Sequence, residues 1–226
     1  MNLSRSEGSS RDLTRYRYLG AVCMLLVIGG VGAMAQEETG VSGYMRVDTD
    51  ALGTQFWFGA THTLGSIEIS SDIYLMGTTG EFDIGPSFAF GPVTLLPMIG
   101  IAFDYGTTGV TTLVTPQLFT TLDSGLYFES WMQFFLSSPF DAERGDSFYT
   151  RNFLLYSFDD TISIGPQIEA AVVFGDEVRL TGLAIGGRIN LGYGANNTLG
   201  IFLGYETKKA EDSGGITGRM TFVRSW

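Results

Sequence analysis

The chain offers few residues that could perform acid–base or nucleophilic chemistry. Its single histidine, His62, has a threonine on each side. A histidine that acts as a general base needs a nucleophile such as serine, and usually an orienting carboxylate, within reach. No serine and acid stand around His62 at a spacing that supports this arrangement. We therefore expect His62 to be an interfacial or turn residue, and the sequence predicts no catalytic residue.

Patterns for cofactors and metals are also missing. No glycine-rich loop follows a strand-like segment and opens a helix, and no group of histidines and cysteines could hold zinc. The segment from Asp141 to Asp146 is acidic, but its residue order lacks the spacing of a calcium-binding loop. We expect a solvated loop there, no metal and no cofactor.

The remaining chemistry lies in charges that alternate with apolar residues. Between Ile67 and Leu75 the odd positions are mostly apolar, whereas the even positions include Glu68, Ser70 and Asp72. This two-residue period is that of a strand with one apolar and one polar face. Charges of one sign around a water-filled path select ions by sign, and acidic residues outnumber basic ones on the polar faces. The residues expected to line such a pore are Glu68, Asp72, Glu81, Asp83, Asp104, Glu129, Gln133, Arg151, Gln167, Glu169, Arg188, Asn190, Glu206, Lys208 and Arg219.

Twelve alternating segments carry these residues. Most of them have the roughly 9 to 11 residues that a tilted strand needs to cross a bilayer, and an even number returns both chain ends to one side. The sequence therefore predicts an all-β fold, a transmembrane antiparallel up-and-down β-barrel of about 12 strands, with an uncertainty of about two. The predicted strands are 41–49, 55–63, 66–76, 81–90, 93–105, 111–122, 126–136, 147–158, 161–174, 178–193, 198–208 and 216–226.

The connections between these segments agree with the predicted topology. If the first strand runs outward, the turns at the inner side fall at 64–65, 91–92, 123–125, 159–160 and 194–197, and all are short. The two longest connections, 137–146 and 209–215, then both lie outside. This is the usual asymmetry of outer-membrane barrels.

A soluble barrel would also alternate, with its apolar side chains inside. Two features favour a membrane barrel instead. The polar faces contain almost no lysine, and the whole chain has only Lys208 and Lys209. Aromatic residues gather near strand ends, for example in Phe56-Trp57-Phe58 and at Phe148 with Tyr149, which suits girdles at the two membrane interfaces.

Residues 1–35 have the features of an export signal. Four arginines precede an apolar run at 19–33, and Ala33-Met34-Ala35 is a small-x-small cleavage site, so we expect the mature chain to begin at Gln36. A transmembrane anchor is the alternative, but the run is short and contains four glycines. The barrel domain expected at 36–226 has nine basic and 22 acidic residues. This acidic balance argues against nucleic acid as a partner.

The final segment resembles the last strand of Gram-negative outer-membrane β-barrel proteins. In that class the strand ends in Phe or Trp, and here Met220 and Phe222 are in phase with the terminal Trp226, although Arg224 breaks the phase. The resemblance implies a location in the bacterial outer membrane, contact with outer-membrane lipid, and recognition of this segment by the barrel-assembly machinery.

Two patterns fit the prediction poorly. Pro86, Pro97, Pro116 and Pro166 fall inside predicted strands, although a closed barrel has no edge at which a missing N–H goes unnoticed. Either bulges absorb them or some boundaries are shifted. In addition, the Ile-Gly-Pro sequences at 84–86 and 164–166 look like related hairpins, yet they point in opposite directions across the membrane. There are two explanations: either the same local pattern arose twice independently, or one strand has been miscounted.

Together these patterns lead us to expect a porin-like channel for the passive diffusion of small solutes, with a preference for cations. The alternatives are a barrel enzyme that modifies outer-membrane lipid and a non-conducting structural barrel. In the structural barrel, the inner charges would serve only to pair with one another.

Overall fold

The computed structural model describes residues 41–104, 111–136, 145–208 and 214–226; the predicted export signal lies outside these ranges. Every predicted strand is present, with ends within two residues of the prediction. No helix in the described ranges is long and apolar enough to cross a membrane. The strands are β1 (Val41–Asp50), β2 (Gly53–Leu64), β3 (Ile67–Met76), β4 (Thr79–Phe90), β5 (Val93–Asp104), β6 (Thr111–Asp123), β7 (Leu126–Phe135), β8 (Asp146–Ser157), β9 (Ile162–Phe174), β10 (Val178–Tyr193), β11 (Asn197–Lys208) and β12 (Gly215–Ser225).

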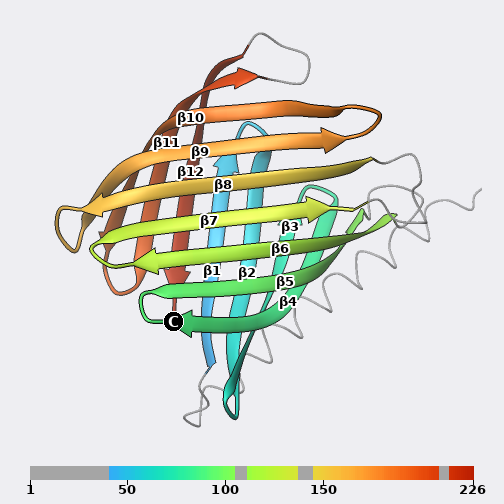
Figure 1. Ribbon diagram of the computed structural model, residues 1–226. Coiled ribbons are helices and arrows are strands. Elements are labelled where there is room, and N and C mark those ends of the chain that lie inside the picture. The colour runs from blue at the N-terminus through green and yellow to red at the C-terminus, as the bar shows by residue number, and fades with distance from the viewer. Residues whose placement is uncertain (1–40, 105–110, 137–144, 209–213) are drawn as a thin grey trace, which may run out of the picture. The chain divides into compact units, whose positions relative to one another are not determined.

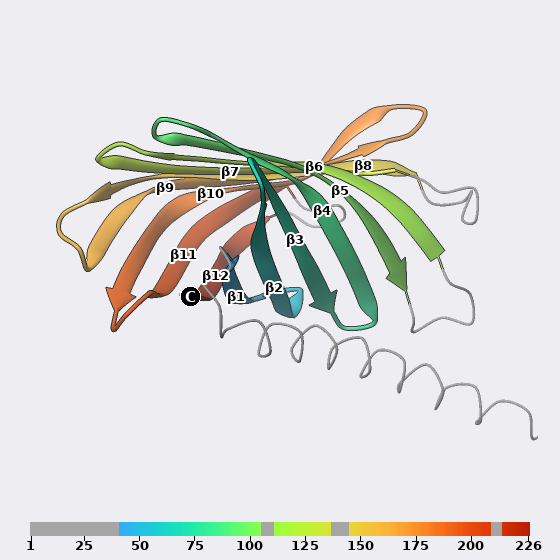
Figure 2. The same ribbon diagram turned by 90° about the horizontal axis from the view of Figure 1, so that it is seen from below.

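The strands form one closed antiparallel barrel in chain order, and β12 pairs with β1 (Figure 1). At this seam Tyr44 lies opposite Ser225, and Gly43 and Trp226 exchange two backbone hydrogen bonds of 3.0 Å. The strands β6 to β9 form one wall, and β1, β2 and β12 form the opposite wall (Figures 1 and 2). Strands of the two walls cross at a steep angle, as the tilt of strands in a barrel requires. Because the sheet closes on itself, every strand has a neighbour on both sides and no strand is an edge strand.

Both ends of the barrel domain lie at the end of the barrel where all five connections are short turns. Gly65 and Gly91 in two of these turns have φ angles of 66° and 59°, a region that residues with a side chain rarely adopt. The connections 137–146 and 209–215 join β7 to β8 and β11 to β12 at the opposite end. The predicted asymmetry between the two ends is therefore confirmed.

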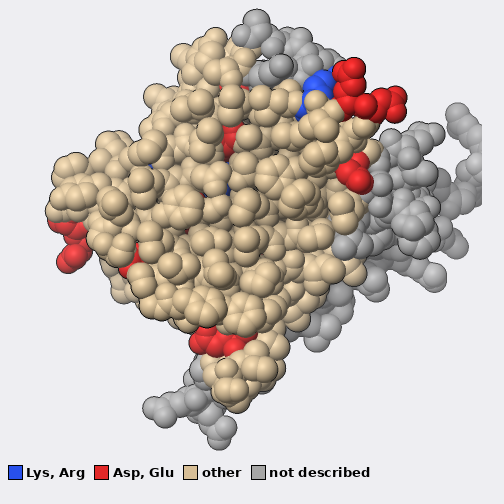
Figure 3. All heavy atoms as spheres, in the orientation of Figure 1, with Lys and Arg blue, Asp and Glu red and all other residues tan. Residues whose placement is uncertain are grey.

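The two faces of the barrel wall differ in chemistry. Outward-facing side chains are large, apolar and exposed, for example Phe82 at 44%, Ile99 at 57% and Leu203 at 64%. In the view of the wall around β5 to β10, charged side chains are few and lie mostly toward its edges (Figure 3). Such a belt of apolar surface is suited to lipid rather than to water. The inner face is polar and largely buried.

The four strand prolines are accommodated by local gaps in the ladders, without a change of register. Between β4 and β5 the paired positions stop at Ile84 and resume at Phe88, and Pro86 and Pro97 face each other in this gap. Pro166 lies in a similar gap between β8 and β9, and Pro116 lies just beyond the end of the β6–β7 ladder. On one side of each proline, therefore, no ladder pair is formed that would require a hydrogen bond from the missing N–H. Neither a bulge nor a shifted boundary is needed, and the strand count is correct.

The glycine before the proline allows the backbones to approach closely at each Gly-Pro gap. A Cβ atom on Gly85 would lie 1.9 Å from the carbonyl oxygen of Pro97, and one on Gly165 would lie 1.8 Å from that of Leu154. Backbone atoms of a closed barrel cannot yield as the tip of a flexible side chain can. A side chain at these positions would therefore strain the wall.

We expect Gly165→Ala to lower the free energy of unfolding of the folded barrel by about 1–3 kcal/mol, the usual cost of overpacking a tight site. Gly187→Ala is the matched control, because Gly187 lies in the neighbouring strand and a Cβ there would meet no atom within 4 Å. Urea unfolding of the two variants in lipid vesicles, followed by tryptophan fluorescence, measures both effects. Equal stability of the two variants would contradict the close approach at Gly165.

Candidate functional site

The inner face carries the polar residues that the sequence pattern selected. Apart from Lys208, the strand register places each of them on the side of the wall where buried charges contact one another. Asp104 and Glu206 lie near the outer ends of β5 and β11, and Glu68 is exposed near the opposite end of β3. The side chain of Lys208 lies outside the described part of the structure. The buried members are Glu81, Asp83, Glu129, Gln133, Arg151, Gln167, Arg188 and Arg219, and the half-buried members are Asp72, Glu169 and Asn190.

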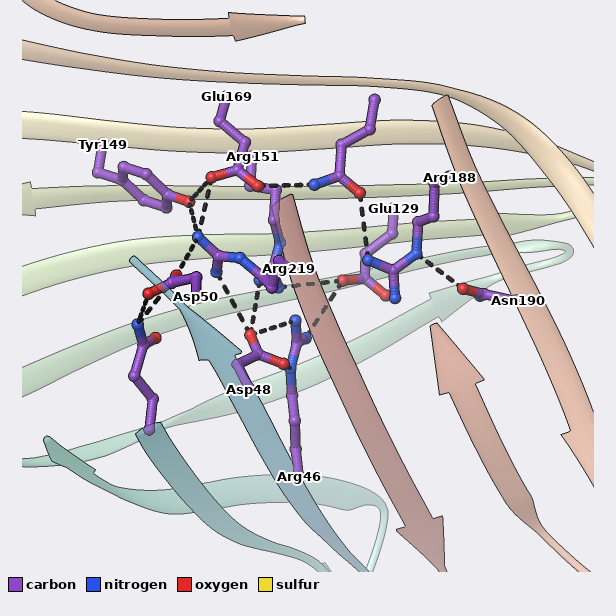
Figure 4. Close-up of polar contacts among 12 residues, drawn as sticks. Arg46, Asp48, Asp50, Glu129, Tyr149, Arg151, Glu169, Arg188, Asn190 and Arg219 are labelled. Carbon is purple, nitrogen blue, oxygen red and sulfur yellow. Dashed lines mark hydrogen bonds and ion pairs between the residues drawn. The ribbon is translucent and has the colours of Figure 1, made fainter. Parts of the chain in front are cut away.

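Asp48 of β1 is the centre of a group of ion pairs (Figure 4). Its fully buried carboxylate accepts hydrogen bonds from Arg46 at 2.9 and 3.0 Å. Arg151 of β8 donates to it at 3.1 Å and Arg219 of β12 at 3.3 Å. Three guanidinium groups around one carboxylate repel one another, so further anions are needed to balance them.

Three more carboxylates supply this balance. Glu129 of β7 lies 3.5 Å from both Arg46 and Arg151. Arg219 lies 2.9 Å from the carboxylates of Asp50 and Glu169. With Arg188, which is joined through Gln167, four arginines and four acids form what we call the arginine cluster: Arg46, Asp48, Asp50, Glu129, Arg151, Glu169, Arg188 and Arg219.

The arginine cluster spans the bore. Arg46 and Asp48 belong to β1, whereas their partners Glu129 and Arg151 belong to β7 and β8 on the opposite wall (Figures 1 and 4). Asp48 is 0% exposed and Arg151 is 1% exposed. Because a barrel of this size has room for a narrow water-filled path, we expected the acids to face water. Instead, side chains fill the bore at this level, and the acids of the cluster are paired.

Arg188 extends the cluster along the inner face. It donates to Gln167 at 3.1 Å and to Asn190 at 2.7 Å, and Gln167 donates to Glu169 at 2.6 Å. The guanidinium group lies against Gly200 of β11, where a Cβ atom would come within 2.1 Å of it. A glycine on the inner face thus provides the space for an arginine of the neighbouring strand.

Aromatic side chains surround the arginine cluster inside the barrel. Trp57 and Trp131 meet edge to face at 6.1 Å, Tyr74 packs on Trp57, and Tyr149 packs on Trp131. The guanidinium groups of Arg46 and Arg151 each lie 5.3 Å from one of the tryptophan rings, within the range of a cation–π interaction. The prediction that Trp57 and Tyr149 belong to interfacial girdles is wrong, because their side chains lie on the inner face. Their outward neighbours Phe56 and Phe148 hold the positions on the lipid side.

A second group on the inner face is formed by Asp72, Glu81 and Asp83, which we call the acidic cluster. Asp72 lies opposite Asp83 in the β3–β4 ladder, and Glu81 lies two positions before Asp83 on the same face of β4. None of the ion pairs found among the described residues involves these three acids.

Neutral donors hold the acidic cluster in place. Thr115 donates to Glu81 at 2.5 Å and to Asp83 at 3.4 Å, and Gln133 also donates to Glu81. Tyr44 donates to Asp72 at 3.1 Å.

Inner-face glycines make room for this cluster as well. A Cβ atom on Gly59 would fall within 2.1 Å of the Tyr44 ring, and one on Gly100 would fall within 1.8 Å of Asp83. These two glycines therefore leave the space in which the ring and the carboxylate lie.

Several residues at the centre of the site were not selected from the sequence. Arg46, Asp48 and Asp50 occupy alternate positions of β1, with Val47 and Thr49 between them and Met45 before them. This is the same two-residue period that identified the other inner-face residues, so the signal was present. The pattern could not predict that Asp48 contacts three arginines, because two of them lie more than 100 positions away in the chain.

His62 lies far from these clusters. It is paired in register with Val41 and Ile69, near the end of the barrel where β1 begins and β12 ends. It shares the outer face of β2 with Phe56 and Phe58. In the described ranges, no hydrogen bond or ion pair joins it to a serine or a carboxylate.

No protein-family model and no curated protein sequence matches the chain. Solved structures of outer-membrane channels share its fold. The KdgM porin, solved in complex with disordered oligogalacturonate, has a TM-score of 0.50 and 11% identity, over 82% of this chain and 99% of that chain. The NanC porin has a TM-score of 0.53 and 10% identity, over 81% and 98%.

An outer-membrane channel from Pseudomonas putida F1 is similar to the same degree, with a TM-score of 0.52 and 12% identity over 85% of this chain and 97% of that chain. At these identities the likeness concerns the fold. The closed barrel of twelve antiparallel strands and its apolar outer belt agree with it. The chain therefore has the fold of these outer-membrane channels, a closed antiparallel β-barrel, here of twelve strands.

Proposed function

We propose that the protein is a narrow outer-membrane channel for the passive diffusion of small solutes and that it favours cations. The observation that carries this proposal is the acidic cluster. Asp72, Glu81 and Asp83 gather on the inner face without an arginine among their described partners, whereas the arginine cluster balances four acids with four bases. The two clusters together leave the bore net negative.

The sign of this charge determines which ions enter. Acidic groups inside a low-dielectric wall attract small cations and repel anions, because the wall concentrates their field in the bore. The porin fold supports the proposal of passive transport, since such channels need no cofactor. The buried ion pairs of the arginine cluster cross the bore, so conduction requires some of them to separate.

A non-conducting structural barrel is the second candidate, and the burial of the arginine cluster favours it. Asp48 and Arg151 are out of contact with solvent, and three guanidinium groups share one carboxylate. A network of this kind satisfies the inner charges without any need for a path through it. The first experiment below separates the two candidates.

A lipid-modifying enzyme is the third alternative, and the position of His62 counts against it. The described contacts give this residue no serine or acid with which it could form a catalytic pair. The side chain also lies near the end of the barrel with the short turns, which is the end opposite to the outer leaflet in barrels of this class.

Reversal potentials in a salt gradient across a planar bilayer test the selectivity. We expect the refolded protein to conduct weakly and to prefer cations at low salt. The double variant Asp72→Asn/Asp83→Asn should shift the preference toward anions, and the shift should fade near 1 M salt, where the Debye length is about 3 Å. Glu177→Gln is the control, because Glu177 is exposed in the turn between β9 and β10 and lies on no strand of the inner face. An anion-preferring pore, or no conduction at any voltage, would rule out the proposed cation channel.

Neutralising the centre of the arginine cluster should loosen it. In Asp48→Asn three guanidinium groups lose their common anion, so we expect larger conductance and a free energy of unfolding lowered by about 3–5 kcal/mol, as when one partner of a buried ion pair is removed. Asp50→Asn should have a smaller effect, because Asp50 pairs with Arg219 alone among the arginines. Conductance and urea unfolding of both variants provide the measurement. A destabilised Asp48→Asn barrel that stays silent would instead support the structural barrel.

We also propose that Met220, Phe222 and Trp226 form the signal that the barrel-assembly machinery reads. Trp226 is half exposed and pairs with Gly43 at the seam. Trp226→Ser loses a contact of roughly 1–3 kcal/mol by burial, which is too little to unfold a closed barrel. We therefore expect a strong loss of assembled protein in cells and little loss of stability after refolding in vitro. Cell fractionation and urea unfolding measure the two quantities, and an unchanged yield in cells would contradict the signal.

A further inference from the structure

Three polar side chains interrupt the apolar outer face at the centre of one wall. Ser130 of β7 donates to the amide oxygen of Asn152 of β8 at 2.6 Å, and the amide nitrogen donates to Thr150 at 2.9 Å. Their strand positions alternate with the buried inner-face residues Glu129, Arg151 and Phe153. The three side chains therefore point away from the bore, and we call them the polar patch. Ser130 is covered by its neighbours and only 5% exposed, so the half-buried Thr150 and Asn152 form the part of the patch that a partner can reach.

The patch lies at the depth of the hydrocarbon core. Ser130 is in the middle of β7 (126–135), and Asn152 is in the middle of β8 (146–157). The surrounding outward residues are apolar and exposed, for example Phe134 at 44%, Leu154 at 40% and Ile168 at 41%. Lipid tails offer no hydrogen-bonding partner at this depth, so a polar group there must be satisfied by protein.

The hydrogen bonds of the patch leave part of the Asn152 amide unused. A primary amide has two N–H donors and an oxygen with two lone pairs. Ser130 and Thr150 take up one acceptor site and one donor. One N–H and one lone pair are left on a half-exposed side chain. A second amide, related to the first by a two-fold rotation, supplies both complementary groups, which makes the patch self-complementary.

The neighbours of the patch permit close approach of a second barrel. Next to Asn152 and Thr150 on the outer face, Ser130 and Ala170 are small, and Ala170 lies opposite Thr150 in the β8–β9 ladder. Association in lipid depends on close packing of small residues and on hydrogen bonds between polar ones. The wall around β7 and β8 meets both conditions. Figure 1 shows these strands in the middle of the wall, and the space-filling view in the same orientation shows few charged side chains on it (Figure 3).

We propose that this wall is the contact between two copies of the chain in the membrane, with Asn152 of each copy hydrogen-bonded to Asn152 of the other. A two-fold contact of this kind places residue 152 on or close to the symmetry axis. The inference does not depend on whether the bore conducts.

Cross-linking in isolated membranes tests the geometry. Asn152→Cys is introduced in a Cys23→Ser background, since Cys23 is the only cysteine of the chain. Because residue 152 meets its own copy, mild oxidation should give a disulfide-linked dimer. Ser71→Cys is the matched control, because Ser71 is also a small polar residue of the outer face in mid-strand, but on β3. Cross-linking at residue 71 to the same extent, or none at residue 152, would overturn the proposal.

A second measurement tests, independently of the cross-link, whether the Asn152 amide stabilises the dimer. The monomer–dimer equilibrium is measured by energy transfer between labelled barrels in phosphatidylcholine vesicles, at several protein-to-lipid ratios. We expect Asn152→Leu to weaken dimerisation by roughly 3- to 30-fold, the effect of one interchain polar contact in lipid. Ser71→Leu should leave it unchanged, and unboiled gel mobility should show that both variants are folded. A wild-type barrel that stays monomeric at every ratio, or an Asn152→Leu barrel that dimerises as well as wild type, would show that lipid or another protein covers the patch.

Discussion

Every backbone N–H and C=O group in a membrane has to find its partner within the protein, because the hydrocarbon core contains no water. The closed ladder from β1 to β12 meets this demand, and the other features follow from it. Closure sets two faces for every strand, so alternate residues must suit lipid on one side and the bore on the other. It also explains how four prolines are tolerated. Each lies at a gap in a ladder while the strand remains paired with its other neighbour, as Pro86 is with Ile69.

The inner face has to satisfy a different demand, because charged side chains that are cut off from solvent need partners. Arginine suits this setting, since its planar group donates five hydrogen bonds and can serve several carboxylates at once. Arg219 illustrates this by contacting Asp48, Asp50 and Glu169. The same logic makes the acidic cluster exceptional, because Thr115, Gln133 and Tyr44 offer it hydrogen bonds but no positive charge. The difference between the clusters, more than the total charge, distinguishes one part of the bore from another.

Much of the fold could be predicted from the sequence because two-residue alternation, turn residues and strand length are local properties. The same alternation placed residues such as Glu81 and Arg188 on the inner face. The pairing of charges could not be predicted, because it depends on which strands face each other across the bore and on how far long side chains reach. Trp57 shows a further limit, since an aromatic run near a strand end looks like a girdle whether its middle residue points toward lipid or inward. The positions of Arg46 and Asp48 were readable, but the role of Asp48 as a shared partner required the three-dimensional arrangement.

The seam between β1 and β12 has a kinetic consequence. Its partners, such as Tyr44 and Ser225, are separated by almost the whole barrel domain, whereas every other ladder joins strands that follow each other in the chain. Contacts of such long sequence separation form late, because bringing distant segments together costs entropy before it yields any contact. Until the seam closes, β1 and β12 are open edges that can pair with any other strand, including those of a second chain. The protein is therefore most prone to aggregation before its first and last strands, β1 and β12, have paired. The time spent in that open state determines how much of the protein aggregates.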